Sequence, residues 1–389
     1  MKKGSSRGPG PARFCGNLRG FVPPIGRKMS SGMVLEKLSN AFGPPGNEGE
    51  IRRIIREELE GLADFSYDRA GSMICGRKGR GNDSPKIMLV AHMDELGFIV
   101  QDITPEGFIR IYPLGSWWPH TLLAQRVTLR TVKADILGVI GAKPTHYLDP
   151  EERKKVLELK DMFVDVGARD QKEAMEDFGI RRGDYVVPHT EFRPLKNPRL
   201  VSGKAFDDRA GVALMIDAIR SLAGEELPNQ VFGVGTVQEE VGTRGAETAP
   251  EMVGPDVAIV LEGAPADDSP GFKREEGQGV LGKGPQIRLF DPSTITNRRL
   301  SQLAVDTARE NHLPHQVAVR ESGGTDAKKI HLHKSGVASA IISVPVRYAH
   351  SHVGLVSLDD YDHTLRLLAA VLRRLDEKAV RSFTDFTDS

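Results

Sequence analysis

The periodic pattern of apolar residues starts well inside the chain and first takes the spacing of an α-helix. The residues with this spacing are Val34, Leu35, Leu38, Ala41 and Phe42. The Pro-Pro-Gly segment at 44–46 ends the run, because proline and glycine interrupt helices. A second helix is predicted over 48–62, where apolar side chains line one face and charged side chains line the other.

Apolar runs that are too short for helices predict buried strands. One such run covers 86–91 and leads to His92. After residue 202, helices and strands alternate along the chain. The predicted helices are 209–222, 297–310 and 358–375, and the predicted strands are 230–237, 257–261, 316–319 and 338–344. This alternation predicts an α/β fold in which a mixed sheet is flanked by helices.

Between residues 96 and 201 the pattern changes to short apolar runs separated by glycine and proline. These runs are 98–100, 108–111, 126–129, 136–140 and 185–187. Regularly spaced short strands predict a small β-barrel inserted into the α/β domain, interrupted by one helix over 149–160. The predicted organisation is a first part of the α/β domain over 33–95, an inserted barrel over 96–201 and a second part over 202–389.

Residues 1–32 lack this periodicity and mix glycine, serine and proline with basic side chains. The basic residues are Lys2, Lys3, Arg7, Arg13, Arg19, Arg27 and Lys28. We interpret the segment as a disordered basic tail, or as an extension upstream of a true start at Met29 or Met33. A targeting segment is the alternative, although the continuous apolar core of a secretory signal is missing.

The 389 residues include 53 basic and 53 acidic side chains, so the formal net charge is zero. This balance argues against nucleic acid or an anionic membrane as the main partner, and it is compatible with a homo-oligomer. No stretch of the sequence is long and apolar enough to span a bilayer. Two cysteines cannot build a disulfide framework, so a cytoplasmic location fits best.

Acids and histidines stand near the ends of several predicted strands. They are His92 and Asp94 after 86–91, Glu239 and Glu240 after 230–237, Glu262 after 257–261, His350 after the run that ends at Val346, and Asp207 with Asp208 before the helix at 209–222. Each of these residues alone is more often structural than functional. Together they predict a ligand site, because open α/β sheets assemble such sites at the carboxyl ends of their strands.

The first of these residues have the chemistry of metal ligands. An acid two positions after a histidine can hold the ring N–H, so Asp94 could orient His92 toward a metal ion. Asp207 could bridge two ions, since each of its carboxylate oxygens can bind one. The structural alternative is that Asp207 or Asp208 caps the helix that follows.

The remaining residues would complete a site for two ions. Glu240 and Glu262 would each supply a carboxylate to one ion, and His350 would be a further ligand. Glu239 is then free to act as a general base that takes a proton from the attacking water and passes it to a leaving amine. A ligand set of nitrogen and oxygen without sulfur suits Zn²⁺ and Co²⁺, and it does not exclude Mn²⁺.

These residues lie in motifs that resemble the M42 family of tetrahedral metallo-aminopeptidases, which includes glutamyl and leucyl aminopeptidases that form dodecameric shells. The motifs are AHMDELG at 91–97, AFDDR at 205–209, VQEEVG at 237–242, DDSPG at 267–271, GTDA at 324–327 and RYAHS at 347–351. The resemblance runs in order from about Val34 to Leu375 and leaves out only the N-terminal tail.

The resemblance implies a ligand for every position of a two-metal site. Asp207 would bridge the ions, His92 and Glu262 would bind one of them, and Glu240 and His350 would bind the other. Many members of the family carry aspartate where this chain has Glu262. Either acid can bind a metal, but the longer side chain could change the spacing of the ions.

The resemblance also implies the roles of the residues beside the ligands. Glu239 would be the general base, and Asp94 would orient His92. Related two-metal peptidases turn the chain sharply after the bridging acid, so the Asp207-Asp208 peptide is predicted to be cis. Such a bond is very rare before a residue other than proline.

The function implied is removal of N-terminal residues from short peptides, with two divalent ions, Zn or Co, in each subunit. The inserted barrel would be a dimerisation domain, and dimers could assemble into a closed dodecamer. Trp117 and Trp118 favour an interface on the barrel, because exposed tryptophans are costly in water. Alternatively, both rings pack inside the barrel or border the cleft. The preferred N-terminal residue could be acidic, aliphatic or basic.

Three other functions fit parts of the pattern. A carboxypeptidase or deacylase would use the same metals but bind a substrate carboxylate or acyl group, and Arg320 and Arg347 are candidates for that contact. A glycosidase is disfavoured for Glu239 and Glu240, because adjacent residues on an extended chain point apart. A non-catalytic, metal-stabilised assembly protein is a further alternative, although each ligand position and the base hold chemically competent residues.

Overall fold

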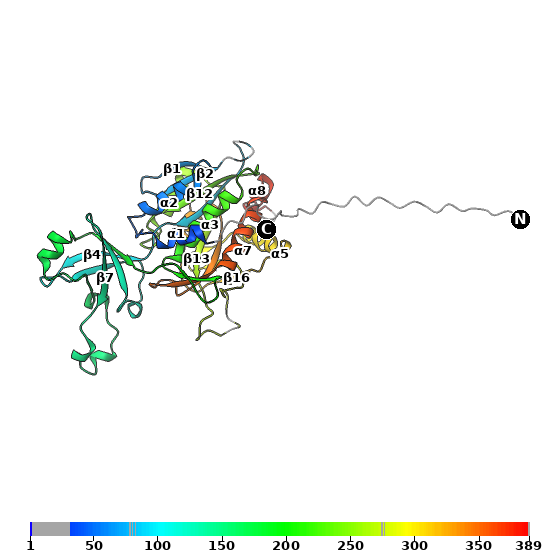
Figure 1. Cartoon of the computed structure of the whole chain (residues 1–389). Coiled ribbons are helices and arrows are strands. Elements are labelled where there is room, and N and C mark those ends of the chain that lie inside the picture. Colours follow the sequence, from blue (N-terminus) through cyan, green and yellow to red (C-terminus); the bar gives the residue numbers. More distant parts are fainter. Residues whose placement is uncertain are drawn as a thin grey trace.

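The computed structural model describes residue 1 and residues 32–387, apart from residues 78, 80, 82, 274 and 276. Almost all of the predicted tail at 1–32 therefore lies outside the described residues. Figure 1 shows a barrel that lies to one side of a larger body of helices and sheet. This arrangement confirms the predicted α/β fold with an inserted small barrel.

The larger body contains a mixed sheet of twelve strands. Its strands are β1 (Asp64–Tyr67), β2 (Met73–Arg77), β3 (Lys86–His92), β10 (Arg193–Pro194), β11 (Leu200–Gly203), β12 (Gln230–Thr236), β13 (Val257–Pro265), β14 (Gln286–Asp291), β15 (Thr294–Ile295), β16 (Gln316–Val319), β17 (Ala338–Arg347) and β18 (Gly354–Ser357). The main order is β1-β2-β12-β3-β13-β17-β18-β11-β10, and β14 joins at β17. The four central strands β12, β3, β13 and β17 run parallel to one another, and the neighbouring strands β2 and β18 pair antiparallel with β12 and β17.

Helices cover both faces of this sheet. They are α1 (Met33–Asn40), α2 (Gly49–Leu59), α3 (Phe206–Ser221), α4 (Arg244–Val253), α5 (Arg298–Glu310), α6 (Ala327–Ile330), α7 (Leu358–Leu372) and α8 (Glu377–Phe383). Successive side chains of β3 enter different cores: Ile87 and Leu89 pack in the core that includes α3, whereas Met88 and Val90 pack in the core under α4 and α6. This alternation follows from the two-residue period of a strand.

The inserted barrel is closed by six strands in the order β4-β5-β8-β7-β6-β9. Their bounds are β4 (Gly97–Ile103), β5 (Ile109–Leu114), β6 (Arg126–Arg130), β7 (Asp135–Gly141), β8 (Phe163–Asp165) and β9 (Tyr185–Pro188). The predicted short strands are confirmed, and β8, with only three residues, was not predicted. The barrel has its own apolar core, separate from the two cores of the large sheet.

The predicted helix over 149–160 is wrong. The structure has only the short turns η3 (Glu152–Lys154) and η4 (Leu159–Asp161) there. Most side chains from 149 to 160 are exposed, and only Leu157 and Leu159 pack against the barrel core, where both are partly buried. The segment therefore buries no continuous apolar helix face. A short helix in water needs such packing, because local propensity alone rarely holds it together. The other short elements of the insertion are η1 (Pro119–Thr121), η2 (Thr145–Tyr147) and η5 (Glu173–Asp177).

The strands of the barrel end before residue 201, the predicted end of the insertion. The last barrel strand ends at Pro188, and β10 and β11 pair with the large sheet instead. The adjacent tryptophans differ in their surroundings: Trp117 packs inward against Phe98, whereas Trp118 is 63% exposed.

Among the residues that the structure describes, no helix has the length and apolarity needed to cross a membrane. The cytoplasmic location stays a prediction.

Candidate metal centre

The fold brings the predicted site residues to one edge of the sheet. His92 is the last residue of β3, and it lies in register with Thr236, the last residue of the parallel strand β12. The chain therefore delivers Glu239 and Glu240 beside His92, because the carboxyl ends of parallel strands meet at the same edge. From the neighbouring strands come Glu262, inside β13, and His350, just after β17.

Asp207 stands between the two histidines. Its Oδ1 lies 3.0 Å from Nε2 of His92, and its Oδ2 lies 3.3 Å from Nε2 of His350. Glu262 adds a carboxylate oxygen 3.6 Å from His92 Nε2, and Glu240 adds one 3.8 Å from His350 Nε2. The donor atoms thus form two groups of three that share Asp207, each group lying within 4.8 Å. We call His92, Asp207 and Glu262 the first group, and Asp207, Glu240 and His350 the second group.

The backbone around Asp207 is irregular. The Asp207-Asp208 peptide is cis, which confirms the prediction. A side chain at Gly263 would place its Cβ 2.3 Å from the carbonyl oxygen of Phe206 and 2.9 Å from Cα of Asp207. Glycine at this position of β13 therefore lets the strand approach Asp207 closely. Of the two aspartates, Asp208 caps the regular part of α3, because its Oδ1 accepts a hydrogen bond from the Gly211 N–H at 2.9 Å.

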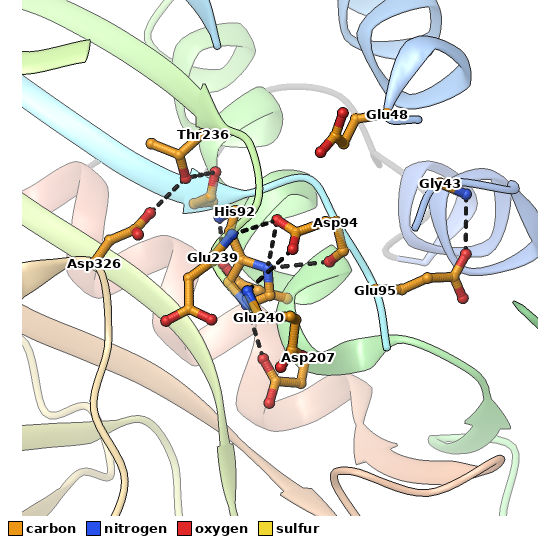
Figure 2. A network of polar contacts seen from close by, with 12 residues as sticks. Gly43, Glu48, His92, Asp94, Glu95, Asp207, Thr236, Glu239, Glu240 and Asp326 are labelled. Atoms are coloured by element: carbon orange, nitrogen blue, oxygen red, sulfur yellow. Dashed lines mark hydrogen bonds and ion pairs between the residues drawn. The ribbon is translucent and has the colours of Figure 1, made fainter. Parts of the chain in front are cut away.

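Asp94 organises more of the site than the sequence indicated. Its backbone carbonyl lies 3.0 Å from Nδ1 of His92, and its carboxylate oxygen Oδ1 lies 3.6 Å from the same atom. The carboxylate also accepts the backbone N–H of Glu239 at 2.9 Å and that of Glu240 at 3.0 Å. Figure 2 shows Asp94 at the centre of this network. One buried acid therefore fixes the histidine and the chain that carries both glutamates.

The electrostatics of the site call for positive charge. Burial, together with nearby carboxylates, raises the pKa of Glu240 to about 8, and burial raises the pKa of Glu262 to about 7. One oxygen of Glu240 is buried and has no hydrogen-bond partner among the described residues. Burial also opposes ionisation of Asp207, but hydrogen bonds to His350 and His92 hold its pKa below the ordinary value. Two cations would compensate these carboxylates, so the donor set fits a pair of ions bound through nitrogen and oxygen.

Comparison with known proteins identifies the family. The family profile for M42 glutamyl aminopeptidase matches residues 71–367. The chain belongs to this family. A glutamyl aminopeptidase from Lactococcus lactis subsp. cremoris is 33% identical over 355 residues, which cover 90% of this chain and 98% of the relative. A lysyl aminopeptidase from Pyrococcus furiosus is 33% identical over 348 residues, covering 88% and 96%.

Solved structures agree with this assignment. A TET aminopeptidase from the archaeon Thaumarchaeota archaeon SCGC AB-539-E09 is 44% identical and has a TM-score of 0.88, with 91% of this chain and 99% of that chain covered. The TET1 peptidase of Pyrococcus horikoshii is 32% identical and has a TM-score of 0.77, with 88% and 99% covered. The M42 resemblance of the motifs is thereby confirmed, and the enzymatic class is that of an aminopeptidase.

A further buried acid of this M42 chain, Asp326, lies next to the site. Asp326 hydrogen-bonds with Thr236 at the end of β12, close to Glu239 (Figure 2). Its motif was noticed in the sequence, but this contact joins residues from different elements and no local pattern reveals it. Burial raises the pKa of Asp326 to about 6.

The two arginines considered for a substrate carboxylate are held by other acids. Arg320 lies 2.7 Å from an oxygen of Asp267, and Arg347 lies 2.6 Å from Oδ1 and 2.7 Å from Oδ2 of Asp268. The DDSPG motif thus provides a partner for each arginine. Asp267 also accepts the backbone N–H groups of Gln278 and Gly279, so the pairs hold the loop that follows β13.

Proposed function

We propose that this M42 aminopeptidase uses two divalent metal ions, Zn²⁺ or Co²⁺, to remove N-terminal residues from short peptides. The observation that supports this most directly is the arrangement of donor atoms in two groups of three that share Asp207. A carboxylate whose two oxygens face two histidines is suited to bridge two ions, and a pair of bridged ions is the arrangement of many hydrolytic sites.

The ligands would divide as the sequence predicts. His92 and Glu262 would hold one ion, Glu240 and His350 would hold the other, and Asp207 would contact both. When bound, the pair supplies Lewis-acid activation of water and polarisation of the peptide carbonyl. Asp94 positions His92, because its carbonyl accepts the ring N–H and leaves the opposite nitrogen free to face the ion.

Glu239 is proposed as the general base. Its backbone N–H is fixed by Asp94, and its carboxylate belongs to neither of the two groups of donor atoms, so it is available for proton transfer. Burial and the neighbouring charges of Asp326, Glu262 and Glu240 raise its pKa above the ordinary value. From this position the Glu239 carboxylate would take the proton of the attacking water and deliver it to the leaving amine.

The ion pairs of Arg320 and Arg347 disfavour the carboxypeptidase alternative. A carboxypeptidase needs a cation that is available to a substrate carboxylate, and both candidates already contact aspartates within the chain. The glycosidase alternative is disfavoured by the peptidase family itself.

We further propose that the protein is a homo-oligomer assembled through the barrel, as a dimer or as a dodecamer. The barrel exposes large apolar side chains that a monomer would leave in water, among them Tyr112, Trp118, Leu137 and Val139. The related TET1 peptidase of Pyrococcus horikoshii can assemble into a tetrahedron or a large octahedral shell. Light scattering should show a smaller particle for Leu137→Asp than for wild type, and an unchanged particle would contradict this role.

Hydrolysis by the full-length protein tests the proposed reaction. A panel of aminoacyl-p-nitroanilides, assayed after addition of Zn²⁺ or Co²⁺, should show cleavage that a chelator abolishes and fresh metal restores. The panel also identifies the preferred N-terminal residue. Peptides with an acetylated N-terminus are the control and should remain intact. Cleavage of acetylated peptides would favour the carboxypeptidase or deacylase alternative, and a metal-loaded protein without any hydrolysis would favour an assembly protein.

A further inference from the structure

A segment of the barrel lies against the second group. Residues 115–117 follow β5, and the backbone carbonyl of Ser116 lies 3.1 Å from Nδ1 of His350. If Nδ1 donates to this carbonyl, Nε2 of the neutral ring carries no proton. Nε2 is the atom that faces Asp207 at 3.3 Å and Glu240 at 3.8 Å. The barrel therefore supplies the acceptor that sets the orientation of His350.

Gly115 brings the same segment into contact with Glu240. Its φ of 91° lies in the region that favours glycine. A Cβ on Gly115 would lie 3.2 Å from Oε2 of Glu240, 3.3 Å from its Cβ and 2.1 Å from a methyl group of Leu96. The backbone of the barrel at Gly115 thus packs directly against the Glu240 side chain.

Trp117 anchors the segment. Its ring stacks on Phe98 with 4.9 Å between centroids and 12° between planes, and its Nε1–H donates to the carbonyl of Gly97 at 2.9 Å. The other side of the segment meets His352, whose ring centroid lies 5.4 Å from that of Trp117. Neither ring nitrogen of His352 has a hydrogen-bond partner in the described part of the chain, so packing against Trp117 helps to hold this ring two residues after His350.

The first group is supported differently. The ring of His92 is held by Asp94, which belongs to the α/β domain, and no residue of the barrel is needed for that contact. We infer that the segment 115–117 is a positioning element for the second group, so that the affinity of the ion held by Glu240 and His350 depends on the barrel and that of the other ion does not. This inference depends on the proposed two-metal function.

Zinc binding by the full-length protein tests the inference. Zn²⁺ content and affinity are measured after dialysis against buffers of fixed free Zn²⁺, with Trp117→Ala compared with wild type. Wild type should bind two ions. Trp117→Ala should weaken one of them by about 10–100-fold, the usual effect of removing a group that orients a metal ligand. Trp118→Ala, which changes the neighbouring exposed ring, is the matched control and should bind as wild type does.

Double variants identify which ion is affected. In Glu262→Gln, where the first group is impaired, adding Trp117→Ala should weaken the remaining ion by the same factor. In Glu240→Gln, where the second group is impaired, adding Trp117→Ala should change nothing. Equal effects in both backgrounds, or no effect in either, would overturn the inference. Wild type binding fewer than two ions would instead contradict the proposed function.

A glycine pair provides a second measurement that does not depend on removing a large, partly buried ring. Gly115 and Gly183 have φ values of 91° and 92°, and both belong to the barrel. A Cβ at Gly183 would meet nothing within 4 Å, whereas one at Gly115 would press on Glu240. Both alanine variants place a side chain at nearly the same φ, so only Gly115→Ala, whose Cβ meets Leu96 and Glu240, should weaken the second ion. Equal zinc affinities in the two variants would count against the inference even if Trp117→Ala could not be purified.

Discussion

Glu95 and Lys204 form a buried ion pair beside the two points where the chain enters and leaves the insertion. The Lys204 ammonium lies 2.7 and 2.6 Å from the two carboxylate oxygens of Glu95, although 109 residues separate them. Arg209 adds a contact at 3.4 Å, and the Gly43 N–H donates to Glu95 at 3.1 Å (Figure 2). Since Glu95 follows Asp94 in the chain, this cluster ties the end of β3 to the segment that leads into α3.

Replacing Glu95 by glutamine should destabilise the protein strongly. The variant leaves Lys204 and Arg209 buried without a counter-charge, and the new amide can turn an N–H₂ group toward their donors. Breaking a buried pair in this way costs about 3 to 5 kcal/mol. Thermal or denaturant unfolding of Glu95→Gln measures the loss.

The matched control is the exposed pair of Lys37 and Glu58. The side chain of Lys37 is 54% exposed, and Glu58 keeps Arg220 as a second partner. Lys37→Met should therefore cost less than about 1 kcal/mol. An equally small loss for Glu95→Gln would show that the buried cluster is not what joins these segments.

Substitution of Asp207 should remove both ions, because it is the only residue present in both groups. Asp207→Ala should retain no tightly bound metal after dialysis, whereas Glu262→Ala should retain one ion per subunit. Elemental analysis of the two purified variants measures this difference. Two ions in Asp207→Ala would refute its role as the bridge.

Glu239→Gln separates metal binding from proton transfer. The variant keeps the shape of the side chain and removes the base, so metal content should persist while kcat falls by roughly 10²–10⁴-fold. Glu247→Gln, which changes a side chain that is 67% exposed on α4, is the control and should keep full activity. Near-wild-type turnover by metal-replete Glu239→Gln would assign the base to another group.

The sequence predicted where the candidate site residues lie better than it predicted the contacts that position them. Acids and histidines at strand ends could be recognised because parallel strands place their carboxyl ends at one edge. His92 follows this rule directly as the last residue of β3, whereas Glu262 lies inside β13, which continues to Pro265. By contrast, Ser116 and His350 are 234 residues apart, and the contact is made by a backbone carbonyl that is common to all residues. No side-chain pattern could have indicated it.

Secondary structure was predictable where burial decides it. The short apolar run of β3 and the apolar face of α7 identified both elements, since each packs against a core. α4 was not predicted; it is a ten-residue helix that contains Pro250. The predicted helix at 149–160 did not form, because the segment packs against the barrel core only through Leu157 and Leu159, and a short helix needs a continuous buried face.

Asp217 should make stability depend on pH. This carboxyl on α3 is 4% exposed and accepts a hydrogen bond from the Tyr361 hydroxyl at 2.7 Å. Burial raises its pKa from 3.8 to about 6, against the opposing effects of Tyr361 and Arg220. A raised carboxyl pKa contributes stability at low pH that is lost as the pH rises through the folded value. Asp217→Asn cannot ionise, so any stability advantage of the variant over wild type should narrow by on the order of 1 kcal/mol as the pH falls from 8 to 5. Unfolding of both proteins across this range measures the gap, and a gap that widens toward pH 5 would show that burial does not govern Asp217.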